Sequence, residues 1–161
     1  MSPTLQFPLY AYVPGETPHP LRAAPGRHRL AHVDDISTAI FYGIDLFDNG
    51  YFWEAHEVWE TAWRDAERDS DPWLFRKSLI RLAAAALKLR VGSQAGVKAH
   101  APWCAHSFTD LARRHPAIDG LSPADLAEFA NDIASGRMTL TDAREDCPAV
   151  LDRALPRIDA P

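Results

Sequence analysis

Apolar residues recur at helical spacing along most of the chain after residue 33. In residues 35–48 the recurring positions are Ile36, Ile40, Ile44 and Phe47. Asp34 or Asp35 can cap the start of this segment, and Asp48-Asn49-Gly50 ends the pattern. We therefore predict a first helix over about 35–48, followed by a tight turn.

Residues 51–66 continue the helical pattern, with one apolar stripe and one polar stripe. The apolar stripe contains Phe52, Ala55, Trp59, Ala62, Trp63 and Ala66, and the opposite face contains Glu54, Glu57, Thr61, Arg64 and Asp65. His56 falls inside the edge of the apolar stripe, and Glu60 flanks it. The pattern predicts a second helix with Glu54 and Glu57 facing solvent.

Three further helices are predicted after residue 70. One spans about 72–91, capped by Asp71 before Pro72, and it is apolar nearly all round, as is typical of the central helix of a bundle. The next spans about 94–115 and contains Pro102, which predicts a kink or a restart. The last opens at Ser122-Pro123 and closes before Gly136. Short connections favour antiparallel neighbours.

Residues 1–32 differ from the rest of the chain because they contain six of the thirteen prolines and no sustained periodicity. This composition predicts an extended arm. Its apolar residues are too many for a solvated tail, so the arm is expected to pack on the helices; they are Phe7, Leu9, Tyr10, Tyr12 and Val13. The predicted fold is an all-α single-domain bundle of about five helices over 33–161, with the arm over 1–32.

Composition narrows the classes of partner. The chain has 161 residues, 47% of them apolar, and a formal net charge of -5, which disfavours nucleic acid and membrane surfaces as partners. No apolar run is long enough for a membrane span, the start lacks the features of a signal peptide, and the two cysteines form no CxxC pair. We expect a cytoplasmic protein with a small-molecule ligand, and the sequence leaves a homo-oligomer open.

The densest chemical cluster is His56-Glu57-Val58-Trp59-Glu60. Side chains four residues apart lie one above the other on a helix, so His56 and Glu60 can reach one common point. That pair could bind a divalent metal ion, but a closed or catalytic site needs at least three protein ligands. The arm histidines His19 and His28 are candidates to complete it. The alternative is a core histidine hydrogen-bonded to a neighbouring acid.

A second candidate is a basic stripe on the apolar third helix, formed by Lys77, Arg81 and Lys88. Unpaired charges are costly to bury, so this stripe either meets acids or faces solvent. If the second and third helices are neighbours, Arg81 could approach Glu60 and His56 and favour an ion-pair network or an anion site over a metal. Arg81 and Lys88 are therefore candidate ligand contacts.

Aromatic residues beside the cluster allow two interpretations. Trp59 and Trp63 are first of all core residues of the second helix, and only secondarily a platform against which a substrate could pack.

The segment from Phe47 to Trp63 resembles a family of uncharacterised prokaryotic proteins, domain of unknown function 309. Its hallmark is an Asn-Gly turn, an aromatic-Glu-Ala-His-Glu segment, and then Glu and Trp, found here as Asn49-Gly50 and Trp53 to Trp63. Leu79-Ile80, Gly92 and Gly96 continue the resemblance, which covers about 40–115. Tyr12-Val13-Pro14-Gly15 and Pro18-His19-Pro20 resemble the arms of longer members.

The resemblance implies an all-helical bundle and a metal-dependent hydrolase activity, a label that itself rests on prediction. It carries over His56, Glu57 and Glu60 as the metal-binding or catalytic residues. Where the family tends to have Gln, a His late in the third helix and Asn in the following turn, this chain has Arg81, Leu87-Lys88 and Ser93.

Two functional hypotheses follow. The first is a small metal-dependent hydrolase with its His/Glu site on the second helix. The second is a non-enzymatic helical module in which a buried His-Glu-Arg network binds a small anion or a protein partner. The sequence does not decide whether the chain is an enzyme.

Overall fold

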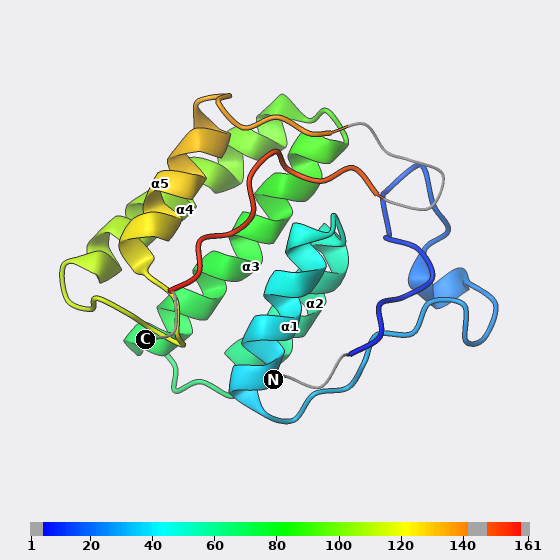
Figure 1. Ribbon diagram of the computed structural model, residues 1–161, viewed down its shortest axis with the longest axis horizontal. Coiled ribbons are helices and arrows are strands. Elements are labelled where there is room, and N and C mark those ends of the chain that lie inside the picture. Colours follow the sequence, from blue (N-terminus) through cyan, green and yellow to red (C-terminus); the bar gives the residue numbers. More distant parts are fainter. Residues whose placement is uncertain (1–4, 142–147, 159–161) are drawn as a thin grey trace.

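Five α-helices pack in chain order in the part of the protein that the computed structural model describes, residues 5–141 and 148–158 (Figure 1). They are α1 (Ile36–Asp48), α2 (Phe52–Arg64), α3 (Asp71–Arg90), α4 (Gln94–Ala112) and α5 (Pro123–Ala134), and a short 3-10 helix, η1 (Pro20–Arg22), lies in the arm. Each α-helix packs on the next one along the chain. The predicted all-α single-domain bundle, with a proline-rich arm packed on it, is confirmed.

The helix starts follow from local capping chemistry. The Asp35 carboxylate accepts a hydrogen bond from the Thr38 N–H, and the Ser122 hydroxyl accepts one from the Asp125 N–H. The cap of α3 is Ser70 and not Asp71, because the Ser70 hydroxyl accepts from the Trp73 N–H. The predicted restart at Pro102 is wrong, since α4 runs through that residue as one helix.

Close contact between α1 and α2 depends on Gly43. The indole Nε1 of Trp59 donates to the Ile40 carbonyl oxygen at 3.1 Å, and a Cβ atom at residue 43 would lie 2.1 Å from that nitrogen. Trp59 is completely buried by this packing. It is therefore a core residue, and the prediction that it could contact a substrate is wrong.

A buried arginine ties α3 to its surroundings. Arg76 donates through Nε and Nη2 to the Asp119 carboxylate, at 2.8 and 3.1 Å, and through Nη1 to the Ala62 carbonyl oxygen at the end of α2. The guanidinium thus joins α2, α3 and the turn before α5. A bidentate pair of this kind is among the stronger polar contacts in proteins.

The arm is attached to α2 through Glu54, which is 0% exposed. Its Oε1 atom lies 2.6 Å from His28 Nε2 and accepts a hydrogen bond from the Tyr12 N–H at 2.7 Å. Burial raises the pKa of Glu54, while His28 and the Tyr12 N–H act in the opposite direction. The prediction that Glu54 faces solvent is wrong, because helical periodicity carries no information about a distant segment that covers the polar face.

Aromatic rings of the arm surround Trp53, the neighbour of Glu54. Tyr12, His19 and His28 each make an edge contact with the Trp53 ring, with centroids 5.4, 6.2 and 5.8 Å away. Glu16 of the arm also forms a two-bond ion pair with Arg90 at the end of α3. In Figure 1 the arm, in blue, lies on the side of α1 and α2 away from α4 and α5.

None of the helices within the described residues is both long enough and apolar enough to cross a membrane.

Gly43→Ala is expected to destabilise the protein by about 3 kcal/mol, because the added methyl group must displace Trp59 and break its hydrogen bond to Ile40. Chemical denaturation measures the loss. Trp59→Leu removes the clashing ring, so the double variant should lose less than the sum of the two single variants. Additive losses would contradict this account of the α1–α2 contact.

His28→Ala is expected to lower stability by about 3 kcal/mol, since it leaves the Glu54 carboxylate buried without its ionisable partner. Limited proteolysis should also cut the arm sooner. His32→Ala is the matched control, because the His32 side chain is 82% exposed and its ion pair is with the exposed Asp34. Equal melting temperatures and digestion rates in the two variants would show that the Glu54 contact does not hold the arm.

Candidate functional site

His56, Glu57 and Glu60 come together on the middle turns of α2. One ligand atom from each residue can be chosen so that all three atoms lie within 4.8 Å of one another, and each residue is half-buried. In the part of the chain that the structure describes, no other group of three His, Cys, Asp or Glu side chains is this compact. The cluster is therefore the candidate site.

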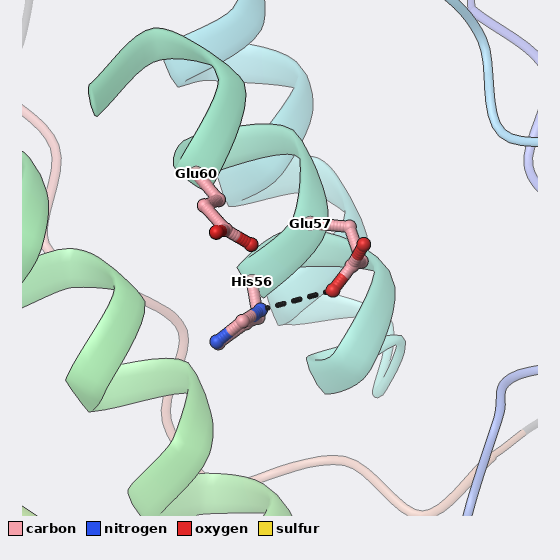
Figure 2. Close-up of side chains that lie close together, drawn as sticks. All are labelled: His56, Glu57 and Glu60. Carbon is pink, nitrogen blue, oxygen red and sulfur yellow. Dashed lines mark hydrogen bonds and ion pairs between the residues drawn. The ribbon is translucent and has the colours of Figure 1, made fainter. Parts of the chain in front are cut away.

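The three side chains do not point the same way (Figure 2). His56 and Glu60 lie on the side of α2 that faces the neighbouring helix, and Glu57 lies on the other side. Glu57 lines a separate hollow of about 230 Å³ with Leu30 to Val33, where the arm leads into α1. Its Oε1 atom nevertheless lies 3.3 Å from His56 Nδ1, so Glu57 and His56 remain in contact.

The partner of Glu60 is Arg64, one turn further along α2. Arg64 Nη2 donates to Glu60 Oε1 at 2.7 Å, and the Arg64 side chain is 67% exposed. The hypothesis of a buried His-Glu-Arg network therefore needs correction in two respects: the group is half-exposed, and its arginine is Arg64.

Arg81 contacts α4 and makes no hydrogen bond to Glu60. Its Nε atom donates to His100 Nδ1 at 3.4 Å, its Nη2 atom donates to the Ala99 carbonyl oxygen at 3.1 Å, and its guanidinium lies over the Trp103 ring, 4.3 Å from the centroid. Stacking and hydrogen bonding of this kind suit a guanidinium better than an ammonium group. The hydrogen bonds of Arg81 thus go to α4, and the predicted ion-pair network of Arg81 with Glu60 does not form.

The two lysines of the basic stripe have different surroundings. The Lys77 ammonium lies over the Trp73 ring, 4.7 Å from its centroid. The Lys88 side chain passes close to Gly96 of α4, where an added Cβ atom would lie 2.5 Å from Lys88 Cγ. Trp63 packs on Trp73 with 5.5 Å between ring centroids. Lys77 and Trp63 therefore lie in one aromatic cluster, and Lys88 lies elsewhere on the α3–α4 surface.

His100 of α4 is the residue that the sequence reasoning missed. Burial lowers its pKa, and the charges of Arg81, Lys88 and His56 lower it further. These groups consequently share one electrostatic neighbourhood across α2, α3 and α4. The sequence could have predicted the contact between Arg81 and His100. The two residues are nearly the same number of positions from the Val91-Gly92 turn, and such residues face each other in a pair of antiparallel helices.

A small pocket adjoins His56 between α2 and α3. Its volume is about 170 Å³, and its apolar lining consists of Phe52, Trp53, Ala83, Ala84 and Leu87. His56 and Lys88 complete the lining.

The arm histidines do not join the compact group. His28 is bound to Glu54, and His19 packs against Tyr12 and Trp53. The compact group around His56 therefore contains neither arm histidine, because both have partners elsewhere. Glu57 supplies the third potential ligand in their place.

Residues 40–99 match the model of a family described as Domain of unknown function (DUF309). This segment belongs to that family. No curated protein and no solved structure matches the chain. The DUF309 segment contains His56, Glu57 and Glu60 as well as Arg81 and Lys88, and it ends one residue before His100. The candidate site of this DUF309 segment therefore lies almost wholly within the region that defines the family.

Lys88→Gln is expected to raise the pKa of His100, because it removes a positive charge that opposes protonation of the imidazole. Titration of the His100 ring signals by NMR measures the change. Lys98→Gln is the control, since Lys98 is an exposed lysine of α4 that does not contribute to the lowered pKa of His100. An unchanged or lower pKa in Lys88→Gln would contradict the shared electrostatic neighbourhood.

The lowered pKa of His100 also has a consequence for stability. Folding lowers the pKa of His100 from its ordinary value of 6.5. At a pH between these two pKa values, the unfolded chain binds more protons at this residue than the folded protein does. His100 should therefore contribute a loss of stability as the pH falls below about 6.5.

Proposed function

We propose that the DUF309 segment holds a divalent metal ion on His56, Glu57 and Glu60 and uses it to hydrolyse a small-molecule substrate. The observation that carries this proposal is the compact group of three ligand atoms within 4.8 Å of one another on one helix. An imidazole with two carboxylates is a donor set that suits several divalent ions.

The geometry supports this use of the three residues. Ligand atoms at about 2.1 Å from a metal ion lie about 3 to 4 Å from one another, so the group must contract by roughly 1 Å. Half-exposed glutamates can make that adjustment by changing rotamer. Glu60 must also leave Arg64, and an exposed i,i+4 pair of this kind stabilises a helix by only about 0.3–0.5 kcal/mol.

Each residue then has a distinct role. A bound metal ion would supply the lowered pKa of a coordinated water molecule. His56 and Glu60 would hold the ion from the side of α2 that faces α3, next to the adjoining pocket. Glu57 reaches the same point from the other side and holds the His56 imidazole through the 3.3 Å contact to Nδ1. Three protein ligands leave further coordination positions for water and substrate.

A second candidate function is a non-enzymatic module that binds a small anion. It is favoured by the mutual pairing of the same side chains, His56 with Glu57 and Glu60 with Arg64, together with the cations Arg81 and Lys88 on the next helix. In this reading the acids of α2 neutralise local charge and bind no metal.

Metal binding by tag-free, chelator-treated protein distinguishes the two functions. Isothermal titration with Zn²⁺ and Mn²⁺ should give about one equivalent in the parent, and His56→Ala should weaken binding by more than about tenfold. His106→Ala is the matched control, because His106 also lies one turn before an acid, Asp110, at 3.3 Å, but lacks a second carboxylate. It should bind metal as the parent does.

Two results would oppose the metal site. One is undiminished stoichiometric binding by His56→Ala. The other is no binding of either ion by the parent, which would favour the non-enzymatic module.

A further inference from the structure

The pocket beside His56 has the size and lining of a site for one ring-sized apolar group. Its five apolar lining residues come from α2 and α3, and its volume is about 170 Å³. A dry apolar cavity of about 150 Å³ is large enough to bind benzene in a protein interior. An apolar group of about six to nine non-hydrogen atoms therefore fits this pocket.

Trp53, one wall of the pocket, is packed against the arm. Tyr12, His19 and His28 of the arm pack against its ring, and His28 is itself held by the buried Glu54. A rigid aromatic wall lowers the entropic cost of binding, because the side chain is already ordered before the ligand arrives. The arm thus contributes to the pocket without lining it.

The pocket lining includes one cationic side chain, Lys88. His56 and Lys88 are its polar side chains, and no carboxylate is among its lining residues. The stem of Lys88 packs against Gly96 of α4, where an added Cβ atom would lie 2.5 Å from Lys88 Cγ. Arg81 and His100 lie in the same electrostatic neighbourhood. The charge that complements the Lys88 ammonium group is negative.

We propose that the pocket between α2 and α3 binds organic acids that carry a ring-sized apolar group, with the apolar group against Trp53 and the carboxylate paired with Lys88. Hydrolysis would break an ester or amide bond carried by such an acid, with the hydroxyl of water going to the acyl carbon and a proton to the leaving alcohol or amine; this step rests on the proposed function, whereas the binding itself needs no metal. The proposal names the substrate class: a small amphipathic carboxylic acid whose reacting part lies at His56.

Three probes test the apolar contact and the carboxylate contact separately on the full, metal-stripped chain. They are phenylacetate, its neutral amide phenylacetamide, and acetate. Binding is followed by the backbone amide signals of ¹⁵N-labelled protein. Phenylacetate should shift signals of residues 52–56 and 83–88. Phenylacetamide should bind about tenfold more weakly, because it lacks the charge-assisted contact with Lys88. Acetate should bind weakest, because it lacks the apolar group.

Variants assign the two contacts. Lys88→Gln should weaken phenylacetate about tenfold and leave phenylacetamide nearly unchanged. Ala84→Leu should prevent binding of both probes by filling the pocket, with signal dispersion and melting temperature reporting whether the variant is folded. Lys98→Gln, an exposed lysine of α4 outside the pocket lining, should bind all probes as the parent does.

The proposal is overturned by equal affinity for phenylacetate and phenylacetamide, by signal shifts that map outside the pocket, or by no binding of phenylacetate. These results are separate from the metal titration. Phenylacetate binding without metal binding would refute the proposed hydrolase and leave the acid site standing. Metal binding without phenylacetate binding would refute the acid site and leave the metal site standing.

Discussion

The buried carboxylate of Glu54 is the constraint on which the surroundings of α2 depend. A carboxylate taken out of water needs compensating partners, and here they are His28 and the Tyr12 N–H, both from the arm. Among the described residues the second oxygen, Oε2, has no hydrogen-bond partner, so the burial is only partly compensated. The arm must therefore lie across Trp53 and Glu54, and this leaves His56 and Glu60 as the polar positions open toward α3.

The same rule explains how α3 accommodates its cations. Arg76 is buried and receives a bidentate acid, Asp119, together with the Ala62 carbonyl oxygen. Lys77 and Arg81 are half-buried and lie over the tryptophan rings of Trp73 and Trp103. Lys88 remains exposed, with its stem beside Gly96. Each cation thus has the surroundings that its degree of burial requires, and Lys88 keeps an ammonium group available to a ligand.

The sequence predicts the helices well because their signals are local. The caps at Asp35 and Ser122 and the i,i+4 relation of His56 and Glu60 involve residues within one or two turns. The environments of Glu54 and Arg81 depend instead on residues 26 and 19 positions away, His28 and His100, which helical periodicity does not describe. The short turn between α3 and α4 could have predicted the second pair, since it sets which residues face each other. The irregular arm offers no comparable rule for the first pair.

The arrangement of charge around His56 links the two proposed sites. Glu57 and Glu60 lie beside it on α2, whereas Lys88 lies across the pocket on α3 and contributes, with Arg81, to the positive potential felt by His100. A cation is therefore favoured on one side of the imidazole and an anion on the other. A carboxylate paired with Lys88 would balance that side without competing for Glu57 or Glu60, so an anionic ligand and a metal ion can occupy neighbouring places at the same time.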